Sequence, residues 1–192
     1  MSFEDLFQYN SNIYSQNGED GIVSEILKRL NLEQEKLWCV EFGAWDGKFL
    51  SNTFALVERN NWYAIYIEGD KKRYDDLLET AQQYKNITPI NKFVESDKND
   101  KNSLDNILSS TKLPIDYELL SIDIDSYDLA IFNDYQGKPK IVIIEIESSI
   151  RPGILQWHNG EHFIGNSFSS TLLVAKEKGY TLVCHTGNMI FV

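Results

Sequence analysis

Apolar and polar positions alternate with two different periods along the chain, and this pattern predicts alternating helices and strands. Apolar residues recur every three or four positions, as in amphipathic helices, in residues 22–30, 54–57, 74–81, 104–108 and 168–175. Short continuous apolar runs lie between them, at residues 37–42, 62–67, 87–94, 118–124 and 140–146. Strands that are apolar throughout indicate a parallel sheet that is covered by helices on both faces.

The end of the chain adds a hairpin to this sheet. Residues 180–185 and 189–192 are apolar, and the intervening Thr186-Gly187-Asn188 is typical of a hairpin turn. Pro89 interrupts the third strand, so this strand is expected at an edge, where a missing hydrogen-bond donor is tolerated. The predicted fold class is therefore α/β: a Rossmann-like, doubly wound, seven-stranded sheet, mostly parallel, with a C-terminal antiparallel hairpin strand.

The length of 192 residues suits a single domain over residues 1–192. Residues 1–17 are predicted to form an N-terminal lead-in. Residues 148–166 show no period and contain Pro152 and three glycines. A long loop of this kind is often functional, so we expect it to lie over the strand ends as a substrate loop.

Charge and composition narrow the possible partners. The net charge is −11 and no basic stripe is present, which argues against nucleic acid. No run of 18 apolar residues exists, so no membrane span is expected, and Met1–Asn10 lacks a signal-peptide pattern. Cys39 and Cys184 lie in apolar runs and are expected to be buried free thiols in a reducing compartment. These features favour a cytoplasmic protein and leave its oligomeric state open.

Acidic residues follow four of the predicted strands. They are Glu41, Glu68, the pair Asp123 and Asp125, and the pair Glu145 and Glu147. In parallel sheets, ligands bind beyond the carboxyl ends of the strands. The sequence therefore predicts a ligand site where these acids meet.

The turn after the first strand indicates which ligand this is. Glu41-x-Gly43-x-x-x-Gly47 places an acid where the dinucleotide fingerprint has its first glycine. An acid there would repel a pyrophosphate, whereas it would favour a ligand that carries an ammonium and a sulfonium. Glu68, at the end of the second strand, stands where a carboxylate can accept hydrogen bonds from ribose hydroxyls.

These motifs resemble a known family. The stretch EFGAWDG at residues 41–47 and the acid Glu68 look like the first motifs of class I S-adenosylmethionine-dependent methyltransferases. The stretches YSQNGED (14–20) and LLSIDID (119–125) are similar to FkbM-type members of that class. The resemblance extends from about residue 14 to residue 192. Many FkbM-type proteins have Glu-Gly after the fourth-strand aspartate, where this chain has Asp125-Ser126, so substrate identity is not carried over.

The resemblance implies S-adenosylmethionine as cofactor and assigns roles by position. Around the methionine end it places Glu41, Gly43 and Gly47, with Gln16 and Gly18 closing over it. Glu68 would bind the ribose, and Phe93, Glu95 and Ser96 would lie near the adenine. Asp123 would lie at the transfer site. The turn residue Asp46 and the helix-start residue Asn52 complete the predicted cofactor site.

Methyl transfer to a hydroxyl requires removal of a proton, and the sequence leaves two routes open. In one, His158 or His162 of the long loop is the general base, because histidine titrates near neutral pH. In the other, Asp123, Asp125, Glu145 and Glu147 hold Mg²⁺ or Mn²⁺, which prefer carboxylate oxygens. Residues two apart on an extended chain project to the same side, which supports each acid pair.

The predicted function is an S-adenosylmethionine-dependent O-methyltransferase. Its acceptor is expected to be a small molecule, with a sugar or sugar-derived compound favoured by the family resemblance. Two alternatives remain: an NAD-binding oxidoreductase, which the acid at position 41 disfavours, and a cofactor-binding module that has lost catalysis.

Overall fold

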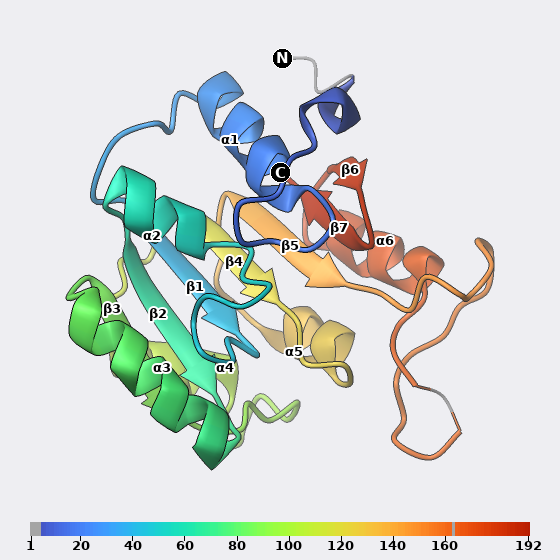
Figure 1. Cartoon of the computed structure of the whole chain (residues 1–192). Helices are drawn as coiled ribbons and strands as arrows, with labels where there is room; N and C mark the ends of the chain where they lie inside the picture. Colours follow the sequence, from blue (N-terminus) through green and yellow to red (C-terminus); the bar gives the residue numbers. More distant parts are fainter. Residues whose placement is uncertain (1–4, 163) are drawn as a thin grey trace.

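In the computed structural model, described for residues 5–162 and 164–192, seven strands form one sheet in the order β3-β2-β1-β4-β5-β7-β6 (Figure 1). The first five strands pair in parallel, while β7 runs antiparallel to β5 and β6. This confirms the predicted α/β fold class and its antiparallel hairpin strand. The strands are β1 (Trp38–Phe42), β2 (Tyr63–Glu68), β3 (Ile87–Asn91), β4 (Leu119–Ile122), β5 (Ile141–Glu145), β6 (Leu182–His185) and β7 (Asn188–Phe191).

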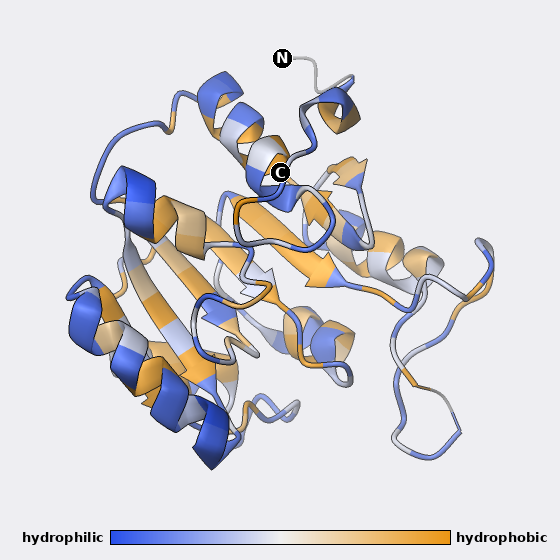
Figure 2. Ribbon diagram, viewed as in Figure 1, coloured by the Kyte–Doolittle hydropathy of each residue, from blue (hydrophilic) through white to orange (hydrophobic). Residues whose placement is uncertain are grey.

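Helices cover both faces of the sheet, and alternate strand residues pack against opposite layers. Cys39 faces a core formed with the first three helices, whereas its neighbour Val40 faces a core formed with the other three. Figure 2 shows the apolar strands between helices whose outer surfaces are polar. The helices in the described residues are α1 (Glu19–Arg29), α2 (Phe54–Asn60), α3 (Lys71–Gln83), α4 (Leu104–Ser109), α5 (Asp128–Asp134) and α6 (Phe168–Glu177), with a short 3₁₀ helix η1 (Leu6–Tyr9).

One local prediction is confirmed, and two helix ends are capped by residues suited to that position. The strand that contains Pro89 is β3, and it lies at an edge of the sheet. The Asp70 side chain caps α3 by accepting hydrogen bonds from the backbone N–H groups of Lys72 and Arg73. Gly179 follows α6 with a left-handed φ of 93°.

Other boundaries differ from those predicted. The helix α1 begins at Glu19, three residues before the apolar pattern does. The N-cap of α2 is Thr53, one residue after the predicted helix-start residue Asn52. Ser51 still contributes, since its Oγ accepts hydrogen bonds from the backbone N–H groups of Thr53 and Phe54.

The segment between β5 and α6 is a long loop that extends away from the sheet (Figure 1). Its base is pinned where Glu147 N donates to the carbonyl of Asn166 and Gln156 N donates to Ser167 Oγ. Residue 163 of this loop, and residues 1–4 of the predicted lead-in, lie outside the described residues. Within the described residues, no helix combines the length and apolar character that crossing a bilayer requires. Both cysteines are free thiols; Cys39 is buried and Cys184 is half-buried.

Candidate functional site

A cavity of about 550 Å³ opens at the carboxyl ends of the central strands. Its wall combines residues at or just after the ends of β1, β2, β3, β4 and β5, and Gln16 reaches it from the lead-in. This volume falls within the range that small-molecule and cofactor sites occupy. Seven of the predicted cofactor and transfer residues line it: Gln16, Glu41, Gly43, Glu68, Phe93, Glu95 and Asp123.

Glu41 is the buried acid at the end of β1, with 4% of its surface exposed. One oxygen accepts hydrogen bonds from Ser51 Oγ (2.7 Å) and Thr53 Oγ1, and the other accepts from the Asn52 backbone N–H (3.1 Å). Burial raises the pKa of Glu41, although these donors oppose the shift. The Glu41 carboxyl group therefore connects the end of β1 to the start of α2, and it also lines the cavity.

Glu68 closes β2 and holds the two turns beside it. Its Oε2 accepts a hydrogen bond from the Trp45 backbone N–H at 2.9 Å, and its Oε1 accepts one from Asp70 N at 2.7 Å. A carboxylate offers about four acceptor positions, so each oxygen can still accept from a ligand hydroxyl. Glu68 thus shapes the rim and retains capacity to bind at it.

Aromatic and basic side chains form the wall next to Glu68. The Arg73 guanidinium lies 3.7 Å from the ring centroid of Trp45, a cation–π contact. Trp45 has a left-handed backbone (φ 49°), and for a bulky residue this conformation is strained. Phe93 is mostly exposed and lies over Gly69, where a Cβ atom would collide with its ring.

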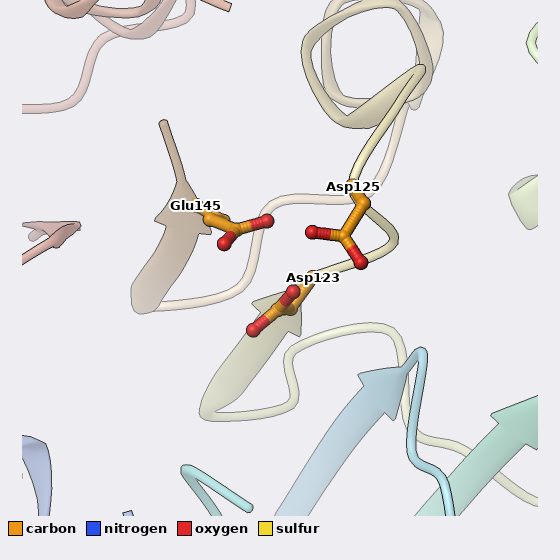
Figure 3. Close-up of side chains that lie close together, drawn as sticks. All are labelled: Asp123, Asp125 and Glu145. Carbon is orange, nitrogen blue, oxygen red and sulfur yellow. The ribbon is translucent and has the colours of Figure 1, made fainter. Parts of the chain in front are cut away.

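Three acids converge at the ends of β4 and β5 (Figure 3). One carboxylate oxygen from each of Asp123, Asp125 and Glu145 lies within 4.8 Å of the others. Burial, followed by the neighbouring Glu145, raises the pKa of Asp123 to about 9. Burial also raises the pKa of Glu145, although its hydrogen bond with Asp123 opposes the shift. The pair therefore shares a proton when no cation is bound.

Asp128, at the start of α5, fixes the turn that carries these acids. Its two oxygens accept hydrogen bonds from Ile124 N and Ser126 N, both at 2.8 Å. The turn holds Asp125 in a left-handed conformation with φ of 59°. This bend brings the Asp125 carboxylate back toward Asp123.

Glu147 is not part of the acidic group, although the sequence predicts it there. The strand β5 ends at Glu145, and the chain then turns toward Asn166. The pKa of Glu147 is instead lowered by hydrogen bonds with Ser149, first from its side chain and then from its backbone N–H, which donates to the Glu147 carboxylate at 3.0 Å.

The two predicted histidines lie outside the cavity wall. The His158 ring packs edge-on against Tyr127, which does line the cavity, at a centroid distance of 4.6 Å. Its Nδ1 accepts a hydrogen bond from Gly165 N at 3.2 Å. The His162 side chain is 80% exposed and lies 4.0 Å from Glu161.

The other predicted cofactor residues do not line the cavity. Asp46 Oδ1 accepts hydrogen bonds from the backbone N–H groups of Lys48 and Phe49. The Asn52 amide donates to Ser121 Oγ at 3.1 Å, and Gly47 packs against Tyr66 and Leu77. Gly18 lies against Asn10, and Ser96 lies beyond Glu95, on the side of α4.

Several cavity residues were not predicted: Phe49, Arg73, Lys92 and Tyr127. Arg73 belongs to the basic run Lys71-Lys72-Arg73, which reads from the sequence as a solvated helix face. Its position in the first turn after Glu68-Gly69-Asp70, however, places it at the carboxyl end of a strand. This position after the second strand could have identified Arg73 as a cavity residue from the sequence.

The fold is shared with known methyltransferases, although sequence comparison finds nothing. No protein-family model matches the chain, and neither does any curated protein. Among solved structures, CurJ carbon methyltransferase matches with a TM-score of 0.59 at 10% identity, over 97% of this chain and 56% of that chain. An S-adenosylmethionine-dependent methyltransferase from Aquifex aeolicus matches with a TM-score of 0.52 at 12% identity, over 100% and 97% of the two chains.

TrmK of M. capricolum, solved in complex with S-adenosyl-homocysteine, matches with a TM-score of 0.53 at 15% identity. That match covers 85% of this chain and 66% of TrmK. This chain therefore spans less than two thirds of the TrmK and CurJ chains and nearly all of the Aquifex chain. At these identities, the likeness establishes the class I methyltransferase fold.

Proposed function

We propose that the protein is an S-adenosylmethionine-dependent O-methyltransferase that acts on a small molecule. The observation that carries this proposal is a single cavity at the carboxyl ends of the strands that brings together Glu41, Glu68 and Asp123. Acids at these positions favour a cationic cofactor over a pyrophosphate, because like charges repel. The shared fold with known methyltransferases supports the same cofactor. The proposed acceptor is a sugar or sugar-derived compound, on the basis of the FkbM-type motifs alone.

In this proposal the cofactor spans the cavity from β3 to β4. Glu68 accepts hydrogen bonds from the ribose hydroxyls with the acceptor positions that Trp45 and Asp70 leave free. Phe93 and Glu95 flank the adenine. Glu41, Gly43 and Gln16 surround the methionine end, and this directs the methyl group toward Asp123. Orientation of this kind can contribute roughly 7–11 kcal/mol to an in-line displacement.

Asp123 is the proposed catalytic residue at the transfer end. It lines the cavity beside Glu145, and the single proton that this pair shares leaves one carboxylate able to take up the proton of a hydroxyl acceptor placed there. His158 is a second candidate, because its ring contacts Tyr127 on the cavity wall. His162, which is largely exposed, would need movement of the loop to reach the acceptor.

Calorimetric titration of the protein with S-adenosylmethionine and with NAD tests the cofactor. We expect S-adenosylmethionine to bind and NAD to show no heat of binding. Binding of NAD alone would favour an oxidoreductase. Binding of S-adenosylmethionine without product formation across a panel of hydroxyl acceptors would favour a non-catalytic module.

Replacing Glu68 with glutamine is expected to weaken S-adenosylmethionine binding by about tenfold or more. Glutamine has the same shape, but its NH₂ group must face the backbone N–H of either Trp45 or Asp70. One turn of the rim then loses its anchor, and a ribose hydroxyl loses a charged acceptor. Calorimetric Kd values for wild type and E68Q measure the effect.

Glu118→Gln is the matched control for E68Q. Glu118 is also buried and accepts a hydrogen bond from a backbone N–H, that of Trp38, but it lies at the opposite end of the sheet. E118Q should lower the free energy of unfolding without changing the Kd. Equal losses of affinity in both variants would mean that Glu68 acts through stability only.

The proposal includes a divalent cation held by Asp123, Asp125 and Glu145. The three groups offer the carboxylate oxygens that Mg²⁺ and Mn²⁺ prefer. We expect EDTA to lower turnover by at least about tenfold and added Mn²⁺ to restore it. Direct titration with Mn²⁺ should show a site in the wild type that Asp125→Asn weakens. Turnover that is insensitive to EDTA would remove the cation from the mechanism.

A further inference from the structure

Two adjacent acids at the start of α1 are buried and hold the loop that precedes the helix. Glu19 has no exposed surface and Asp20 is 6% exposed. Neither residue lines the cavity. Burying two carboxylates costs stability unless they are well hydrogen-bonded, so their partners show what they are for.

Asp20 binds the first half of the loop. Its Oδ2 accepts hydrogen bonds from three consecutive backbone N–H groups, those of Ile13, Tyr14 and Ser15, at 2.7–2.8 Å. The Ser15 hydroxyl donates to the same oxygen, and it accepts a hydrogen bond from the Asp20 backbone N–H. Asp20 Oδ1 is buried and has no hydrogen-bond partner among the described residues. All the hydrogen bonds that the Asp20 side chain accepts therefore come from residues 13–15.

Glu19 binds the second half of the loop and connects it to the end of the chain. Its Oε2 accepts a hydrogen bond from Asn17 N at 2.8 Å. Its Oε1 accepts from Thr186 Oγ1 at 2.6 Å and from Asn188 Nδ2 at 3.1 Å. Glu19 thus fastens the loop to the turn of the β6–β7 hairpin, which belongs to the sheet.

Gln16 is the residue between these two anchors. The Asn12 amide donates to the Gln16 carbonyl at 2.9 Å, and the Asn12 side-chain oxygen accepts from Gly18 N. The backbone on both sides of Gln16 is therefore fixed, while its side chain is exposed and lines the cavity. A fixed backbone that presents one exposed side chain to the cavity is partly preorganised for contact, which reduces the entropy lost when a ligand binds.

We infer that Glu19 and Asp20 are positioning residues that hold Gln16 at the cavity mouth to contact the bound cofactor. This inference rests on the proposed function, because the cofactor is the ligand that Gln16 would meet. Glu19 and Asp20, the two acids of the YSQNGED stretch, would thus act on the cofactor through Gln16 without touching it. It also makes the C-terminal hairpin turn a support of the cofactor site.

A double-mutant cycle on S-adenosylmethionine affinity tests the inference, because residues that act through one another have non-additive effects. Gln16→Ala should weaken binding by about tenfold. Asp20→Asn, which has the same shape but a weaker acceptor, should weaken it by about fivefold. The double variant should bind no more weakly than Q16A alone. Additive losses, or Q16A at wild-type affinity, would overturn the inference and leave the proposed function standing.

Two further variants keep the experiment decisive. If D20N does not fold, Ser15→Ala replaces it in the cycle, since it removes the hydroxyl contacts with Asp20 and Asn12 and keeps the backbone N–H that Asp20 accepts from. Glu25→Gln is the matched control, because Glu25 is an acid of α1 that pairs with Arg29 away from the loop, and its Kd should equal that of wild type. A wild-type protein that binds no S-adenosylmethionine would overturn both the inference and the proposed function.

Discussion

Replacing Gly43 with alanine is expected to abolish S-adenosylmethionine binding and to lower the free energy of unfolding by about 3 kcal/mol or more. Gly43 follows β1 with φ of 78°, a conformation that costs any residue with a Cβ atom. That Cβ would overlap the carbonyl oxygen of Asp123 and lie 2.8 Å from its carbonyl carbon. The ends of β1 and β4 would have to separate, and the cavity lies between them. Urea unfolding and calorimetric titration measure the two effects.

Gly179→Ala is the control that separates backbone strain from collision. Gly179 has a similar φ of 93°, but no atom lies within 4 Å of the position of its Cβ. We expect G179A to cost about 1–2 kcal/mol of stability and to leave the Kd unchanged. If G43A cost no more than G179A, the close approach of β1 to the Asp123 backbone would not be a requirement of the site.

The sheet and its two helical layers are predictable because they depend on local patterns. Each central strand is apolar at successive positions such as Cys39 and Val40, and this is possible only when both faces are covered. Pro89 predicts an edge strand for an equally local reason, since proline has no backbone N–H to donate to a neighbouring strand. The third strand ends at Asn91 rather than at Val94, because β2, its only partner among the described strands, ends at Glu68, which pairs with Asn91. Beyond it, Phe93 packs on Gly69.

The acidic group was predictable only in part, because it depends on where each strand stops. The rule that residues two apart share a side holds only while the chain is extended. After β5 the chain turns at once, and Glu147 leaves the group. After β4 the chain also turns, yet Asp128 bends the turn so that Asp125 returns to Asp123. Two acids spaced two residues apart therefore lie together after β4 and apart after β5. The difference arises because hydrogen bonds with residues further along the chain set the shape of each turn.

Glu41 shows a similar limit. Its place at the end of β1 predicts a carboxylate at the ligand site, and Glu41 does line the cavity. The sequence does not reveal that Ser51, Asn52 and Thr53 all donate to it. These contacts need the fold of the turn between β1 and α2, which no periodicity describes. The Glu41 side chain therefore both holds the turn between β1 and α2 and has a proposed role in cofactor binding.

Replacing Asp123 with asparagine is expected to lower kcat by about 100-fold or more while the Kd for S-adenosylmethionine changes by less than about threefold. Asparagine keeps the size of the side chain and can donate to Glu145 where the shared proton now lies. It can neither accept a proton from the acceptor nor supply a charged ligand to a cation. Both roles proposed for Asp123, as the base and as a cation ligand, are therefore lost in D123N. Initial rates at saturating cofactor and calorimetric titration measure the two quantities separately.

Glu147→Gln is the matched control for D123N, because Glu147 follows the neighbouring strand β5 but lies outside the acidic group. Its kcat should equal that of wild type. His158→Gln decides between the candidate bases: if the histidine is the base, H158Q loses the rate and D123N retains it. A D123N enzyme with wild-type kcat would therefore transfer the catalytic role from the strand ends to the long loop. Loss of rate in D123N alone would locate proton removal at the ends of β4 and β5, beside the proposed cofactor cavity.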